Sequence, residues 1–416
     1  MKKYGLPIIA FLALNLIYAQ NTVVIPNSDD SRVITTGLPF MLIAPDARSA
    51  SMGDMGVATS VDGFSQQYNP AKYAFSETKS GIGLSYTPYL TRLVNDISLS
   101  YLTYFNRINE YSAFSASVKY FSLGEIVLTQ DANDPGVAVK PNEYAIDAAY
   151  TLRLSDQFAM AVAMRYMRSA LRIDTVDPNA NPGSTFGADI TGYYQSEEEA
   201  YNDFNGRWRL AFAIQNLGPR FKYDDGGNEV FQPTNLRLGA GFDFIFDEYN
   251  KLGVTAEVGK YLVPTPPIRG NEYEFIDNNG NGTYEADEDE LVDSNNPIRT
   301  NVIVEGQDND VSFLTGVFQS FGDAPGGFSE EIKEFTWALG AEYLYQESFA
   351  LRLGYFNESE EKGSRKFFSL GAGFKYTTIN VDLSYLFSAS KVQSPLENTL
   401  RFSLTFNFGD GEYDEY

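Results

Sequence analysis

Alternation of apolar and polar residues over segments of about ten residues constrains this fold more than any other feature. In residues 398–409 every second side chain is apolar and those between are polar: Leu400, Phe402, Leu404, Phe406 and Phe408 alternate with Arg401, Ser403, Thr405 and Asn407. Successive side chains of a β-strand point to opposite faces, so this segment predicts a strand with one apolar and one polar face.

About thirteen segments share this pattern, and their length suits the strands of a membrane barrel. They are 81–88, 96–105, 111–121, 143–154, 157–168, 207–216, 234–244, 250–262, 335–345, 348–357, 366–376, 378–387 and 398–409. Amphipathic helical periodicity is scarce, so the sequence predicts an all-β fold.

A soluble β-sandwich and a transmembrane antiparallel β-barrel both explain such alternation. Two features favour the barrel, because a barrel has a polar lumen and an aromatic-rimmed lipid face. The polar faces of the expected strands carry charged residues: Arg153, Arg207, Arg209, Arg237, Asp243, Arg352 and Asp382. The apolar faces of the expected strands carry aromatic residues near the strand ends: Tyr86, Tyr144, Tyr376 and Phe408.

Charge and composition exclude several functions. The chain has a net charge of -24, so nucleic acid is not an expected partner. It contains no Cys and no His, which excludes thiol nucleophiles, Ser-His-Asp triads and the usual zinc sites.

The N-terminus has the pattern of a secretory signal peptide over residues 1–19. Lys2 and Lys3 precede an apolar run, and cleavage is expected after Ala19. Ile17, three residues before the expected cleavage site, is larger than the small residue favoured at that position, so the sequence does not fix which bond is cleaved. An uncleaved anchor helix is the alternative, although the run is short for a membrane span.

The connections between expected strands are either short turns or long polar segments. The long ones cover 122–142, 169–206, 217–233 and 263–334. Outer-membrane barrels place short turns in the periplasm and long loops outside, so we expect these segments at the cell surface. A connection as long as 263–334 usually has a function of its own.

Residues 46–74 are rich in Gly, Ala and Ser, and they precede the first convincing strand. Small residues such as Gly53 and Gly56 allow close backbone packing, so this segment can fold into the barrel as a plug. A disordered leader is the alternative, but Met52 and Phe64 are too apolar for a solvated linker. We therefore expect an N-terminal extension and hatch over 20–79 and the barrel over 80–410.

The stretches "GLPFMLIAPDARSASMGDMGVAT" and "QQYNPAKYAF" resemble the N-terminal hatch of FadL-like outer-membrane proteins, and most closely the PorV family of the Bacteroidetes type IX secretion system. The resemblance extends to "LGPRFKYDDG", "FQPTNLRLGAGFDF" and "NTLRFSLTFNFG". It implies a 14-stranded barrel in a Gram-negative outer membrane, without enzymatic activity. Its hatch motif falls on Gly53, Gly56, Asn69, Pro70 and Ala71.

The resemblance further implies a shuttle in protein secretion. Such a protein accepts cargo with a conserved C-terminal domain from a large translocon barrel, SprA (also called Sov). It passes the cargo to a surface attachment complex that contains the sortase-like protease PorU. A FadL-like transporter of hydrophobic small molecules is the alternative, and it would need an apolar pocket. The charged lumen positions favour the shuttle, while an adhesive protein would show repeats, which the sequence lacks.

Residues 277–288, "DNNGNGTYEADE", match the pattern of a calcium-binding EF-hand loop. Gly282 occupies the position of the sharp turn. The predicted ligands are Asp277, Asn279, Asn281, Thr283, Glu285 and Glu288. Calcium binds six to eight hard oxygen atoms, which closely spaced carboxylates, amides and carbonyls supply. An acidic solvated loop is the alternative, because the surroundings are rich in acids and helical flanks are not evident.

If the loop binds a structural calcium ion, Glu288→Gln removes the bidentate ligand and weakens the order of the loop without unfolding the barrel. Limited proteolysis of the loop, with calcium and with chelator, measures this. Equal cleavage rates in calcium and in chelator would exclude calcium binding here.

Overall fold

The computed structural model describes residues 21–27, 31–90, 96–129, 134–171, 182–223, 227–389 and 399–410. The expected signal peptide, residues 1–19, lies outside this part. The chain forms two compact units, Arg32–Pro266 with Gly306–Tyr416, and Met1–Ser31 with Pro267–Glu305. None of the helices in the described ranges has the length and apolar character required to cross a membrane.

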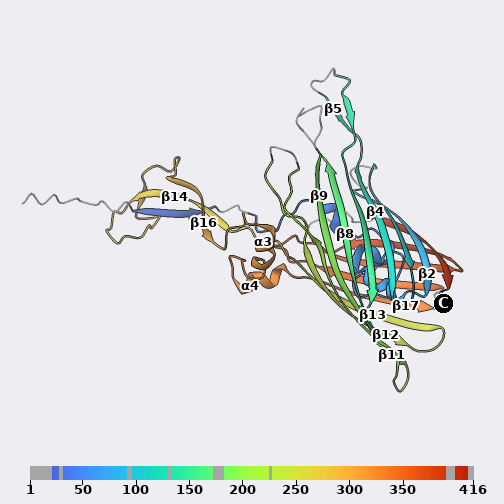
Figure 1. Ribbon diagram of the computed structural model, residues 1–416. Coiled ribbons are helices and arrows are strands. Elements are labelled where there is room, and N and C mark those ends of the chain that lie inside the picture. The colour runs from blue at the N-terminus through green and yellow to red at the C-terminus, as the bar shows by residue number, and fades with distance from the viewer. Residues whose placement is uncertain are drawn as a thin grey trace, which may run out of the picture. The chain divides into compact units, whose positions relative to one another are not determined.

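The larger unit is a closed antiparallel β-barrel of fourteen strands (Figure 1). Each strand pairs with its neighbours in the order of the chain, and β2 pairs with β21. The strands are β2 (Thr78–Pro88), β3 (Ile97–Arg107), β4 (Ser112–Leu123), β7 (Asn142–Arg153), β8 (Phe158–Ala170), β9 (Gly183–Gln195), β11 (Asn205–Leu217), β12 (Asn235–Ile245), β13 (Asn250–Tyr261), β17 (Thr336–Tyr345), β18 (Phe349–Asn357), β19 (Lys366–Tyr376), β20 (Ile379–Ser388) and β21 (Leu400–Asp410). The predicted fold class, an all-β transmembrane barrel, is confirmed.

The two faces of the strands follow the predicted alternation. Outward side chains are apolar and exposed, as Leu351, Leu353 and Trp208 are. Inward side chains are polar and buried, and Arg165 and Arg401 are among the largest of them. An apolar outer surface requires a hydrocarbon environment, so the barrel presents these residues to lipid.

The fourteenth strand, β9, was not among the thirteen strands expected from the sequence, which left residues 169–206 as one loop. Small residues weaken the apolar periodicity of β9, because Ala188 and Gly192 stand on its outward face between Phe186, Ile190 and Tyr194. Hydrogen bonds on both sides, to β8 and to β11, hold it in the wall. Pairing with the neighbouring strands therefore stabilises β9, although its own alternation of apolar and polar residues is weak.

The connections differ in length between the two ends of the barrel. Residues 108–111, 154–157, 246–249, 346–348 and 377–378 form short turns at one end, which we call the short-turn end. A two-residue strand, β10 (Glu199–Ala200), also lies there, before β11. The opposite, long-loop end carries β5 (Ile126–Leu128) paired with β6 (Val137–Val139). By the asymmetry of outer-membrane barrels, the long-loop end faces out of the cell.

The connection between β13 and β17, expected as the loop 263–334, contains secondary structure. Within the barrel unit it carries α3 (Phe313–Gln319), α4 (Phe328–Glu331) and the 3-10 helix η3 (Ile332–Glu334). Residues Pro267–Glu305 of the same connection belong to the smaller unit, which contains a four-stranded sheet. Its strands are β1 (Thr22–Pro26), β14 (Ile268–Ile276), β15 (Glu290–Leu291) and β16 (Arg299–Glu305), with β14 in the centre.

Leu353→Arg tests the orientation of the barrel in the membrane. Leu353 lies at the middle of β18 and is 57% exposed on the outward face. A charge at the membrane midplane should destabilise the barrel by about 2–4 kcal/mol. Urea unfolding in lipid vesicles measures this loss. Asp156→Arg, in a short turn, is the control and should change stability by less than about 1 kcal/mol; equal losses for both variants would contradict the orientation.

Candidate functional site

Residues 37–76, which we call the inner segment, lie inside the barrel. Short helices form within it: η1 (Pro39–Leu42), α1 (Ala47–Ala50), α2 (Ser65–Tyr68) and η2 (Pro70–Phe75). Side chains cap two of these helices: at α1 the Asp46 carboxylate accepts the Ser49 N–H at 2.7 Å, and at η2 the Asn69 side-chain oxygen accepts the Ala71 N–H at 3.1 Å. Most side chains of the segment are buried, including Arg48 and Lys72.

Two predicted glycines stand where the backbone approaches another group closely. Gly53 has a left-handed φ of 76°, and a Cβ there would lie 2.8 Å from the carbonyl oxygen of Tyr355 on β18. A Cβ on Gly56 would lie 2.3 Å from the ring of Tyr68. Only glycine fits both sites without movement of the neighbours, which accounts for the small-residue composition of this stretch.

The Asn-Pro-Ala triplet contacts the wall of the barrel. The Asn69 amide donates to the carbonyl oxygens of Val57 at 3.1 Å and Gly192 at 3.0 Å. The Pro70 carbonyl accepts the Thr151 hydroxyl at 2.9 Å. Ala71 is fully buried in a cluster of small wall residues and Tyr193. These hatch-motif residues thus meet at the surface between the inner segment and strands β7, β8 and β9.

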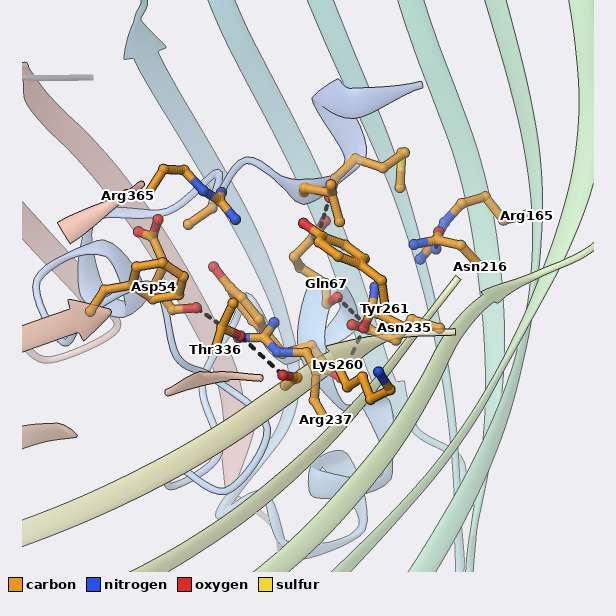
Figure 2. Close-up of a pocket in the computed structure, with 17 residues that line it drawn as sticks. Asp54, Gln67, Arg165, Asn216, Asn235, Arg237, Lys260, Tyr261, Thr336 and Arg365 are labelled. Atoms are coloured by element: carbon orange, nitrogen blue, oxygen red, sulfur yellow. Dashed lines mark hydrogen bonds between the residues drawn. The ribbon is translucent and has the colours of Figure 1, made fainter. Parts of the chain in front are cut away.

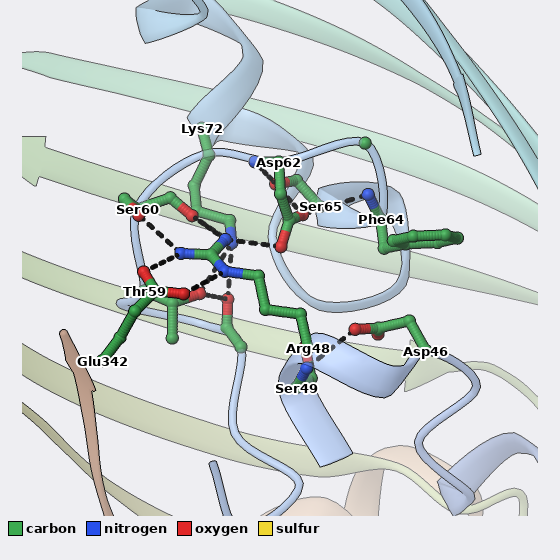
Figure 3. Close-up of polar contacts among 12 residues, drawn as sticks. Asp46, Arg48, Ser49, Thr59, Ser60, Asp62, Phe64, Ser65, Lys72 and Glu342 are labelled. Carbon is green, nitrogen blue, oxygen red and sulfur yellow. Dashed lines mark hydrogen bonds and ion pairs between the residues drawn. The ribbon is translucent and has the colours of Figure 1, made fainter. Parts of the chain in front are cut away.

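Arg48 is the centre of a buried ion-pair network (Figure 3). Its guanidinium binds both carboxylate oxygens of Glu342 on β17, at 2.9 and 2.8 Å, and also Asp62 at 2.6 Å. Arg352 of β18 contacts the same Glu342 carboxylate at 2.5 Å and Asp382 of β20 at 2.6 Å. Two wall carboxylates and Asp62 of the inner segment therefore contact one arginine of the wall and one of the inner segment.

A second network lies around Arg165 of β8. Arg165 pairs with Asp147 at 3.1 Å and with Asp189 at 2.9 Å, and all three side chains are almost fully buried. Gln66 of the inner segment donates to the same Asp147 carboxylate at 2.5 Å. Lys119 adds a contact of another kind, since its ammonium donates to the carbonyl oxygens of Met41 and Ile43. Uncharged polar groups of the inner segment thus supply hydrogen bonds to buried charges of the wall.

Most charges predicted to face the lumen do so. Arg209 pairs with Asp243, Arg352 with Asp382, and Arg237 with Glu257. Arg153 and Arg207 also have the inward parity of their strands, but they lie near the short-turn end, where water is close. Arg153 donates to the Asp156 carbonyl in a short turn, and Arg207 pairs with the half-exposed Glu198.

Two cavities lie on opposite sides of the inner segment. The cavity at the long-loop end is lined largely by polar and charged side chains, among them Asp54, Asn235, Arg237, Lys260 and Arg365 (Figure 2). The cavity at the short-turn end is lined by Arg48, Asp62, Arg207, Lys251 and Glu347 among others. The two sets of lining residues share no member. An apolar ligand would meet charged groups in both.

The sequence did not predict a buried cluster of acids and lysines at the long-loop end. Lys260 contacts Glu331 at 2.7 Å and Glu334 at 2.6 Å, and Lys362 contacts Glu330 at 2.6 Å and Glu334 at 3.0 Å. The Asp323 carboxylate lies within 4.8 Å of Glu331 and Glu334. Burial, together with Glu334 and Glu331, raises the pKa of Asp323 to about 6. The three-residue spacing of Glu331 and Glu334 was the available signal for this cluster.

The predicted calcium loop brings several of its residues together within the smaller unit. The Asp277 carboxylate accepts the N–H groups of Gly280 and Gly282, at 2.6 and 2.8 Å. The Asn279 amide donates to Glu288 at 2.8 Å. The Asn281 side chain accepts the Thr283 N–H, and Glu285 lies 3.4 Å from the Asn279 amide. Strands β14 and β15 flank the loop, not helices. The residues fit calcium in type and order, and binding stays a prediction.

Arg48→Met should destabilise the barrel unit by about 3–5 kcal/mol, because it removes the buried cation that Glu342 and Asp62 share. Arg207→Met is the matched control, since its ion pair with Glu198 is partly exposed and should be worth less than about 1 kcal/mol. Chemical unfolding in detergent measures both. Similar losses for the two variants would show that the Arg48 network does not stabilise the inner segment.

Several solved structures align with most of this chain at low sequence identity. The CymD monoaromatic hydrocarbon channel aligns with a TM-score of 0.46 and 12% identity, over 89% of this chain and 99% of that chain. A FadL homologue of Pseudomonas aeruginosa aligns with a TM-score of 0.44 and 12% identity, over 91% and 100%. The Pseudomonas putida toluene transporter TodX aligns with a TM-score of 0.43 and 9% identity, over 90% and 98%. Identities this low transfer no ligand to this chain.

Comparison with curated proteins finds no match. The protein family described as "Type IX secretion system protein PorV" matches residues 26–268, which is more than half of the 416 residues. The matched range includes the inner segment and the first nine strands of the barrel wall. This chain therefore belongs to the PorV family of type IX secretion system proteins.

Proposed function

We propose that this outer-membrane barrel is a non-enzymatic shuttle of type IX secretion. In this proposal it accepts cargo with a conserved C-terminal domain from a SprA-like translocon barrel and passes the cargo to an attachment complex with a PorU-like sortase. Membership in a secretion family supports the context. The observation that carries the proposal is the inner segment, which forms buried ion pairs and hydrogen bonds with the wall. Because this segment occupies the lumen, we propose that partner proteins bind at the long-loop end.

The inner segment has the contacts expected of a plug. It separates two cavities that share no lining residue, and Glu257 of the wall accepts the N–H groups of Gly56 and Val57, both at 3.0 Å. Withdrawal of the segment would take hydrogen-bond donors away from such buried carboxylates, which is costly even where a wall arginine remains. These contacts support a lumen that stays closed, as a platform for protein binding requires.

The long-loop end offers a surface suited to a protein partner. Phe318 of α3 is 77% exposed and Phe328 of α4 is 80% exposed. Leu314, Phe321 and Ile332 are also exposed on these helices or next to them. Exposed apolar side chains in one region mark interaction sites. We propose that this apolar surface, residues 314–332, contacts the translocon.

Purification of the tagged protein from detergent-solubilised outer membrane tests the shuttle. We expect co-purification of a giant barrel or of proteins that share a C-terminal domain. Recovery of the barrel alone with bound hydrophobic compounds would contradict the shuttle and support the FadL-like transporter.

A double variant, Phe318→Ser with Phe328→Ser, tests the apolar surface. Loss of two large apolar contacts should reduce recovery of the giant barrel by about tenfold or more. Val127→Ser, in the β5–β6 hairpin at the same end, is the control, because Val127 is also exposed, at 53%. Undiminished recovery with the double variant would place the translocon contact elsewhere.

A further inference from the structure

The inner segment runs through the barrel from one end to the other. At its C-terminal end it leads into β2 at the short-turn end, where the Ser76 carbonyl accepts from Arg107 at 2.6 Å. At its N-terminal end, Leu38 and Phe40 pack in a cluster with Leu99 and Phe121, which lie at the long-loop ends of β3 and β4. The Gly37 N–H donates at 2.8 Å to the Phe231 carbonyl, in the connection between β11 and β12. The chain therefore enters the lumen from the long-loop side.

Residues that precede the inner segment contact the long loops. The Arg32 guanidinium forms an ion pair with Glu330 of α4. Glu330 is 5% exposed and belongs to the buried cluster with Lys362 and Glu334. Four carboxylates in and around this cluster face only two lysines, and Arg32 supplies a third cation. A buried carboxylate needs such a partner, so this contact attaches the N-terminal chain to the β13–β17 connection.

Strand β1 pairs with the same connection of the chain. Its register with β14 extends from Thr22 opposite Glu274 to Pro26 opposite Gly270. The Phe275 N–H donates to the Asn21 carbonyl at 3.0 Å, and the Asn27 N–H donates to the Arg269 carbonyl at 2.8 Å. Since β14 lies in sequence between β13 and β17, β1 is hydrogen-bonded to a segment that leaves the barrel at its long-loop end.

We infer that residues 21–27 and 31–36 lie on the cell-surface side of the outer membrane, as an N-terminal strap that threads out through the lumen and fastens the β13–β17 connection. The two ends of the wall differ accordingly: the strap is outside, while β21 ends at the short-turn, periplasmic end next to Thr78. This inference goes beyond the proposed function and is independent of the identity of cargo and partners.

Cysteine labelling of the full-length protein on intact cells tests the position of the strap. The chain has no Cys, so each single substitution gives one reactive thiol. Thr22→Cys, exposed in β1, should react with a membrane-impermeant maleimide as fully as Ser294→Cys in the long connection. Asp156→Cys, exposed in a short turn, should react only after the membrane is permeabilised. If Thr22→Cys behaves like Asp156→Cys, the inference is wrong.

Removal of the Arg32 contact tests the fastening role. In the purified full-length protein, Arg32→Ala should raise the rate of chymotrypsin cleavage at Phe318 and Phe328 by about tenfold, since a charged hydrogen-bonded pair is lost. Lys333→Ala is the matched control, because Lys333 pairs with Glu361 nearby at the surface. Cleavage rates that are the same for both variants would show that the strap does not hold this connection.

Discussion

Pairing of buried charges between the inner segment and the barrel wall is the constraint on which the rest of the structure depends. A guanidinium or carboxylate removed from water is costly unless an opposite charge and hydrogen bonds compensate. Here the compensation is divided between two parts of the chain: Glu342 of the wall faces Arg48, and Asp147 faces both Arg165 and Gln66. Barrel and inner segment therefore require each other, and neither would have its polar groups satisfied alone.

This mutual dependence supports the proposal that the barrel is a platform for protein binding. Inside the barrel, the close contacts of the inner segment leave no room for a Cβ at Gly53, and the two cavities described above have charged side chains in their linings. In the long β13–β17 connection, α3 and α4 expose large apolar side chains, which is where we propose that a partner binds. The proposed strap adds a further charge pair of this kind, because Arg32, which precedes the inner segment, pairs with Glu330 of the β13–β17 connection.

Much of the fold was predictable because alternation is a local property. Thirteen of the fourteen strands showed it, and the exception, β9, carries Ala188 and Gly192 on its outward face, so only its pairing with β8 and β11 identifies it. The need for glycine at Gly53 and Gly56 was also predictable, because close backbone approach is a local requirement. Arg48 and Lys119 were not, because nothing local distinguishes a buried lysine or arginine from an exposed one. Their partners lie on distant strands or in carbonyl groups of the inner segment.

The sequence by itself determined which side of each strand meets lipid and which meets the lumen, because side-chain direction follows residue parity and apolar rows cannot face water at low cost. Tertiary structure alone decided how the lumen charges are paired, where Asp323 and its neighbours gather, and which end of the barrel receives the N-terminal chain. Those features depend on contacts between residues that are far apart in the sequence, such as Arg32 and Glu330, which are 298 positions apart, and Asp54 and Arg401, which are 347 apart. Only the closed wall brings such residues together, and electrostatic energy then selects their partners.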